Sequence, residues 1–115
     1  MEFKDLIVYQ KALQVNKDIS IHTLSIHELD KSLKDQLRRA SLSIVLNIAE
    51  GSSRFSPADR KNFFVIARGS TFECAAILDV VGLTVKKEFL DIALRLEEIS
   101  KMLYKMIDTL RGHSR

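Results

Sequence analysis

The stretch that decides the fold spans residues 38–54 and reads Arg38-Arg39-Ala40-Ser41-Leu42-Ser43-Ile44-Val45-Leu46-Asn47-Ile48-Ala49-Glu50-Gly51-Ser52-Ser53-Arg54. At about 100° per residue, a helix through this stretch and the turn before it carries a continuous apolar face. That face consists of Leu33, Leu37, Ala40, Ile44 and Ile48. Further apolar residues widen the face around the helix, so we expect this helix to contact protein on two sides.

The remainder of this helix is a narrow polar stripe. Its members recur every three or four positions and are Gln36, Arg39, Ser43, Asn47, Glu50 and Arg54. Glu50 precedes Arg54 by four residues, which is the favourable order for an ion pair on a helix. Ser70 and Glu73, on a later helix, are spaced to face the stripe across an antiparallel pair.

We define the polar cluster as Asn47, Glu50, Arg54, Ser70 and Glu73. The favoured interpretation is a hydrogen-bonded lock, because a polar residue beside an apolar seam commonly fixes register or oligomeric state. The alternatives are a ligand or partner site and, with the least support, catalysis. The residues themselves leave these alternatives open.

The composition is that of one globular, helix-rich domain covering residues 1–115. Hydrophobic residues make up 46% of the chain and charged residues 29%, with one proline and four glycines. The single cysteine, Cys74, lies at an apolar helical position, so we interpret it as a small core residue and not as a nucleophile.

No pattern in the chain predicts an enzyme. The histidines, His22, His27 and His113, do not follow a glutamate by three residues, as a di-iron helical bundle requires. Phosphate-binding glycine loops, cysteine pairs and Gly-x-Ser-x-Gly elbows are also missing from the sequence. We therefore expect no catalytic residues, no metal and no cofactor.

The hydropathy pattern predicts a cytoplasmic protein without a membrane partner. The apolar run from Leu6 to Tyr9 is too short for a signal peptide, and no window approaches the roughly 20 apolar residues of a membrane span.

The net charge of +3 conceals an uneven distribution. Residues 31–68 hold eight basic and three acidic side chains, a balance of +5, whereas the segment before them is acidic and the segment after them is neutral. Such an excess is typical of proteins that bind an anionic partner, although it is also compatible with an ordinary solvated surface. The candidate residues for binding RNA or DNA are Arg38, Arg39, Arg54, Arg60, Lys61 and Arg68.

Apolar residues recur every three or four positions in four segments, which predicts helices at about residues 4–23, 31–52, 57–82 and 86–111. Ser56-Pro57-Ala58-Asp59 combines a capping hydroxyl with a proline at the first helical position, so it marks the start of the third helix. Short connections make successive helices antiparallel. We therefore predict an all-α, up-down-up-down four-helix bundle.

Two helices carry more apolar surface than one bundle core covers. The second has Leu42, Val45 and Leu46 beside its seam, and the third has Val65, Phe72 and Ala76 opposite its seam. Exposed apolar surface of this size marks an interface. These six residues are therefore predicted to form a homo-oligomer interface. The alternative to nucleic-acid binding is an oligomeric scaffold or adaptor that binds another protein.

The string Gln36-Leu37-Arg38-Arg39-Ala40, followed by Ser43-Ile44 and Asn47-Ile48-Ala49-Glu50-Gly51, resembles the signature of a known family. This family comprises bacterial four-helix bundle proteins associated with 23S ribosomal RNA intervening sequences. The likeness extends over nearly the whole chain, including residues 3–12 and 64–73. Such proteins are similar to the accessory subunits of diversity-generating retroelements, so the resemblance implies a pentameric homo-oligomer and nucleic-acid binding.

Overall fold

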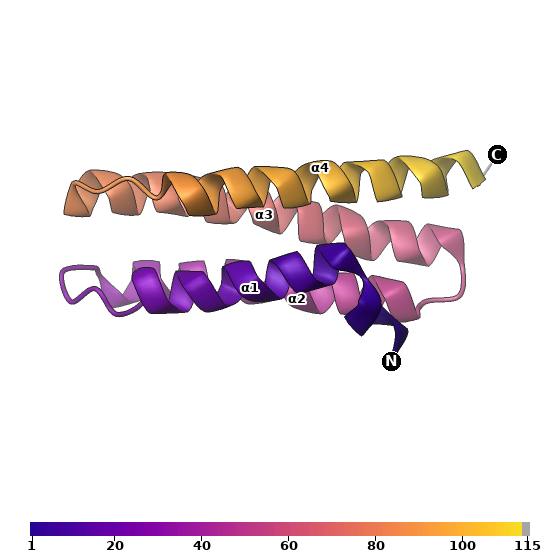
Figure 1. Cartoon of the computed structure of the whole chain (residues 1–115), viewed down its shortest axis with the longest axis horizontal. Helices are drawn as coiled ribbons and strands as arrows, with labels where there is room; N and C mark the ends of the chain where they lie inside the picture. The colour runs from indigo at the N-terminus through magenta and orange to yellow at the C-terminus, as the bar shows by residue number, and fades with distance from the viewer. Residues whose placement is uncertain (114–115) are drawn as a thin grey trace.

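Four long helices lie side by side along an axis of 49 Å (Figure 1). The computed structural model describes residues 1–113, which form a short 3₁₀ helix, η1 (Glu2–Asp5), and then α1 (Ile7–His22), α2 (Lys31–Ser53), α3 (Pro57–Val85) and α4 (Leu90–His113). The α2 helix packs against α3, α3 packs against α4, and α1 lies against both α2 and α4. The predicted all-α, up-down-up-down four-helix bundle is confirmed.

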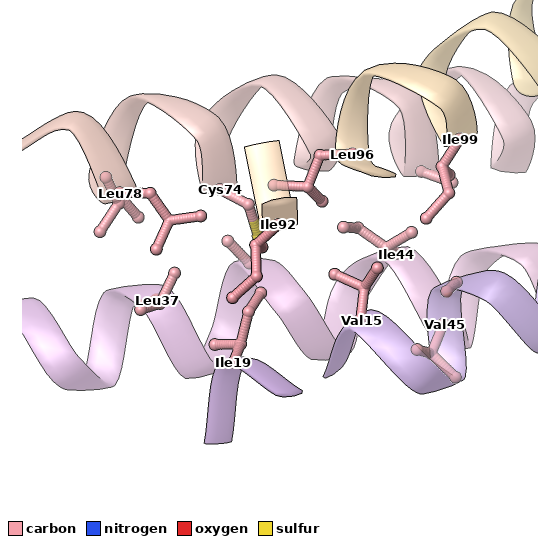
Figure 2. Packing of buried hydrophobic residues seen from close by; sticks show 14 of the residues in the cluster. Val15, Ile19, Leu37, Ile44, Val45, Cys74, Leu78, Ile92, Leu96 and Ile99 are labelled. Carbon is pink, nitrogen blue, oxygen red and sulfur yellow. The ribbon is translucent and has the colours of Figure 1, made fainter. Parts of the chain in front are cut away.

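Each helix contributes one apolar stripe to a common core, as Figure 2 shows. The first and fourth helices show the spacing of these stripes clearly. In both helices the buried residues are three or four positions apart, because that spacing returns a side chain to the same face. They are Val8, Ala12, Val15 and Ile19 in α1 and Ile92, Leu96, Ile99, Leu103 and Ile107 in α4.

Cys74 is completely buried in this core (Figure 2). Burial, with a smaller contribution from the charge of Glu73, raises the pKa of the Cys74 thiol to about 12. The thiolate is the reactive form of cysteine, so the buried side chain stays protonated and inert at neutral pH. Its interpretation as a small core residue is confirmed.

The third helix begins where its capping signal predicts. The backbone N–H of Asp59 donates to the Ser56 hydroxyl over 3.1 Å, and Pro57 occupies the first turn. The helix continues to Val85, three residues beyond the predicted end at residue 82, and stops because Lys86 is left-handed (φ 54°). Gly82 does not end the helix but lets the backbone of Lys87 pack closely against it, since a Cβ at Gly82 would lie 2.7 Å from the carbonyl oxygen of Lys87.

Two helices also begin later in the chain than predicted. The first helix begins at Ile7 and not at residue 4, because Leu6 is extended (ψ 127°) and separates η1 from α1. At this junction between η1 and α1, the Gln10 side chain donates a hydrogen bond to the Lys4 carbonyl oxygen over 2.9 Å. The fourth helix begins at Leu90 and not at residue 86, because the chain reverses at the left-handed Lys86.

Gly51 lies where the end of α2 packs closely against α3. A Cβ at this position would lie 2.7 Å from Cε1 of Phe64, whose side chain is 1% exposed and has no room to move. We expect Gly51→Ala to lower the free energy of unfolding by about 1–3 kcal/mol, because overpacking shifts a well-packed core. Chemical denaturation at a fixed protein concentration measures this.

The matched control is Gly69→Ala in α3, where an added Cβ meets nothing within 4 Å. This change should raise stability by about 0.5–1 kcal/mol, since alanine favours helix over glycine. Equal stability of the two variants would contradict the assigned role of Gly51.

Candidate functional site

The polar stripe of α2 meets α3 at Ser43. The Ser43 hydroxyl accepts hydrogen bonds from the Asn47 side-chain amide over 3.0 Å and from the Ser70 hydroxyl over 2.8 Å. The same Asn47 amide nitrogen donates to the Ser43 carbonyl oxygen over 2.8 Å. Asn47 and Ser70 are therefore brought together through a third residue, and the link joins the two helices at a defined register.

One turn further along the stripe, Glu50 and Arg54 form the ion pair that their spacing predicts, with 3.0 Å between Oε1 and Nη2. The Arg54 guanidinium also lies over the ring of Phe63, 4.7 Å from its centroid. Glu73 is exposed and takes no part in these bonds. The structure thus divides the predicted polar cluster into a Ser43-centred lock, an Arg54 pair and a separate Glu73.

The six candidate cations do not form one patch. Arg38 and Arg39 precede Arg54 by about 15 residues on the same helix, which is roughly 22 Å at 1.5 Å per residue. Arg38 is paired with Asp35 at 2.9 Å, and Arg54 is paired with Glu50. The other four pair with no carboxylate among residues 1–113 and are Arg39, Arg60, Lys61 and Arg68.

Three of the four unpaired cations lie in the first half of α3, close to the turn that joins it to α2 (Figure 1). Residues 54–68 contain Arg54, Arg60, Lys61 and Arg68 but one carboxylate, that of Asp59. Phe55 is fully exposed in this turn. The basic excess seen in the sequence is therefore divided between the two ends of the bundle, because residues 31–39 at the start of α2 also carry four basic side chains and one carboxylate.

Sequence reasoning did not find the aromatic partners of Arg68. The Arg68 guanidinium carbon lies 4.9 Å from the ring centroid of Phe72 and 5.4 Å from that of Tyr104. Phe72 follows Arg68 by four residues, a spacing that signals contact on a helix. Tyr104 gives no such signal, because it belongs to α4.

The predicted interface residues take three different positions. Leu42, Leu46 and Val65 are 44%, 56% and 49% exposed, and Ala76 is also exposed. Val45 was predicted with them but is 5% exposed, because it points into the core (Figure 2), so this assignment is wrong for the isolated chain. Phe72 is exposed but lies at the α4 side, against Arg68.

We define the outer face as the exposed apolar side chains of α2 and α3 next to the Ser43–Ser70 contact. Since the helices are antiparallel, Leu46, three residues after Ser43, comes near Ile66, four residues before Ser70. Val80, which belongs to the same predicted apolar line as Val65 and Ala76, is about half exposed, and so is Ile66, which was not assigned to an interface. The outer face consists of Leu42, Leu46, Val65, Ile66, Ala76 and Val80.

The part of the chain that the structure describes offers neither a cluster of metal ligands nor a membrane-spanning helix. Residues 1–113 contain no group of three histidine, cysteine, aspartate or glutamate side chains arranged to hold a metal ion. Within the same residues, no helix combines the length and hydrophobicity needed to span a membrane.

The fold and the Ser43 lock define a class of helical bundle whose second and third helices are held in register by a polar stripe. A family model described as 23S rRNA-intervening sequence protein matches residues 4–105, and the chain belongs to this family. It is also similar to a solved structure from Bacteroides thetaiotaomicron, described as a protein with unknown function from the S23 ribosomal protein family. No curated protein matches the chain.

That structural likeness has a TM-score of 0.80 at 24% sequence identity and covers 88% of this chain and 98% of the other. At this identity it establishes a shared fold. The family match over residues 4–105 confirms the resemblance predicted from the sequence.

The Ser43 lock is tested by a double-mutant cycle of Ser43→Ala and Ser70→Ala. Each single change removes one partner of a part-buried hydrogen bond, so each should lower the free energy of unfolding by about 0.5–1.5 kcal/mol. The double variant should lose less than the sum of the two, by at least about 0.5 kcal/mol, because the residues are in contact. Strict additivity in denaturant titrations would contradict a direct Ser43–Ser70 bond.

Proposed function

We propose that this chain is a non-enzymatic, oligomeric, cytoplasmic protein that binds RNA or DNA through cations of α2 and α3. The observation that supports this proposal best is the group of unpaired cations Arg60, Lys61 and Arg68 on α3, near the turn that carries Arg54. Cations without carboxylate partners remain available for phosphate groups, and phosphate contacts supply most of the affinity of such binding.

Oligomerisation would multiply this charge. The outer face leaves six apolar side chains of two adjacent helices in water, and a subunit contact would cover them. In a closed ring, such as the pentamer that the resemblance implies, each subunit repeats the same set of cations. Several weak phosphate sites on one particle would then bind a long nucleic acid together.

Salt dependence tests the nucleic-acid proposal. Labelled structured RNA and duplex DNA are titrated with protein at about 50 and 200 mM salt, and binding should weaken steeply at the higher salt. The double change Arg60→Gln/Lys61→Gln should make the slope of log affinity against log salt shallower by about two, since each phosphate contact contributes about 0.9. Fluorescence anisotropy provides the measurement.

A double change at Lys17 and Lys86 to glutamine removes the same charge outside α2 and α3 and should leave the slope nearly unchanged. Both lysines are exposed and form no ion pair within residues 1–113. If folded wild-type protein binds neither nucleic acid at about 50 mM salt, the proposal is refuted.

Light scattering tests the assembly. Wild-type protein should have a mass that is two or more times 13.1 kDa, and Leu46→Glu should give a smaller, still helical species. The reason is that a carboxylate buried without a partner in the subunit contact costs several kcal/mol, whereas in the monomer Leu46 is exposed.

The control is Leu94→Glu on α4, where the leucine is 56% exposed but lies outside the outer face. This variant should assemble like the wild type. A wild-type mass of 13.1 kDa at micromolar concentration would rule out the homo-oligomer. The outer face would then favour the second candidate function, an adaptor that binds a different protein.

A further inference from the structure

An arginine lies between two aromatic rings where α3 and α4 meet. Arg68 and Phe72 come from α3 and Tyr104 from α4, and the guanidinium carbon is 4.9 Å and 5.4 Å from the two ring centroids. Phe72 is 54% exposed and Tyr104 is 52% exposed. Both rings therefore hold the cation while a large part of their own surface remains in contact with solvent.

The Arg68 guanidinium is not neutralised by an ion pair in the described chain. It forms no ion pair within residues 1–113, and its Nε is buried without a hydrogen-bond partner. A purely structural arginine in a bundle is usually neutralised by a carboxylate on a neighbouring helix, as Arg95 is by Asp18 at 2.7 Å. Arg68 is positioned by aromatic contacts instead, and this leaves its charge available.

Half-exposed aromatic rings beside an available guanidinium match the chemistry of an unpaired nucleotide. The flat face of a base stacks on an aromatic ring, and the phosphate next to it pairs with the arginine. A duplex does not offer this, because its bases are stacked on one another. The geometry therefore selects single-stranded over double-stranded nucleic acid.

Two further cations lie on the same helical faces as Arg68 and Tyr104. Lys61 precedes Arg68 by seven residues and Arg111 follows Tyr104 by seven, so each shares a helical face with its neighbour in the cluster. Because α3 and α4 are antiparallel, both cations lie toward the same end of the bundle. The acidic side chains near these residues in sequence are Glu73, which follows Phe72 directly, Asp59, two residues before Lys61, and Asp108, one turn after Tyr104.

We propose that Arg68, Phe72 and Tyr104 form a stacking platform for the unpaired bases of single-stranded RNA or DNA. This inference rests on the nucleic-acid binding proposed above and specifies the substrate class. It assigns Phe72, which shares a helical face with Val65, to the ligand site at the α4 edge of the outer face, and it leaves the α2 side of that face to subunit contact.

Tyrosine fluorescence reports directly on this platform. The chain has two tyrosines, Tyr9 and Tyr104, and no tryptophan. In the Tyr9→Phe variant, Tyr104 is the remaining tyrosine, and a stacked base should quench its emission. The probe is unlabelled oligothymidylate of about twelve nucleotides, within the usual site size for single strands. Quenching should be saturable and should follow the binding curve measured by anisotropy.

The matched control is Tyr104→Phe, which keeps the ring and leaves Tyr9 as the emitter. Tyr9 lies in α1 and contacts Phe3 edge-on, and neither ring is among the aromatic partners of Arg68. This variant should bind oligothymidylate like the wild type, and its Tyr9 emission should change by no more than the absorbance of the added oligonucleotide.

Tyr104→Ala should weaken binding of oligothymidylate roughly 5- to 100-fold, the range for loss of one base–aromatic stack. Phe72→Ala should act in the same direction, and both should change duplex affinity by less than about twofold because stacked bases do not reach the rings. Circular dichroism confirms that the variants remain helical, as expected for changes at half-exposed positions.

Wild-type affinity for oligothymidylate in both alanine variants, or a Tyr104 emission that does not respond to bound single strand, would overturn the platform. Nucleic-acid binding through the other cations would then still stand. If the wild type binds neither single strand nor duplex, the platform and the proposed function are both refuted.

Discussion

The close packing of α2 against α3 is the constraint on which the rest of the structure depends. Gly51 brings the end of α2 against the buried ring of Phe64, and the Ser43–Ser70 hydrogen bond fixes how the two helices are aligned along their axes. The first contact sets their separation and the second sets their register. With both defined, α1 and α4 complete the core by packing against this pair.

The same pair explains why polar and apolar groups are distributed as they are. Most of the polar stripe of α2 forms bonds within the molecule. Asn47 donates a hydrogen bond to Ser43, and Glu50 forms an ion pair with Arg54. The flank beyond the stripe, with Leu42 and Leu46, is left without a neighbour in the isolated chain. A bundle in which α1 lies on the other side of α2 cannot cover that flank, so the surplus apolar surface follows from the topology.

Helical periodicity was sufficient to predict the four helices and most of the core, because a 3.6-residue repeat places buried residues on one face. Periodicity did not predict the burial or contacts of residues whose surroundings depend on a neighbouring helix. Val45 lies on an apolar flank of α2, and the helix pattern does not reveal that this flank is turned inward. Tyr104 meets Arg68 from 36 residues away, so their contact depends on the α3–α4 register. The density of basic residues along the chain likewise did not show that Arg38 and Arg54 are already paired.

The aromatic contacts of two arginines have a consequence for the entropy of binding. Long arginine side chains normally lose rotamer freedom when a ligand immobilises them, at roughly 0.5–1.5 kcal/mol for each. Arg54 is already restrained by Glu50 and Phe63, and Arg68 by Phe72 and Tyr104. Both guanidinium groups are preorganised on a rigid helical frame. A ligand that meets them therefore gains their interactions with little further ordering of the protein.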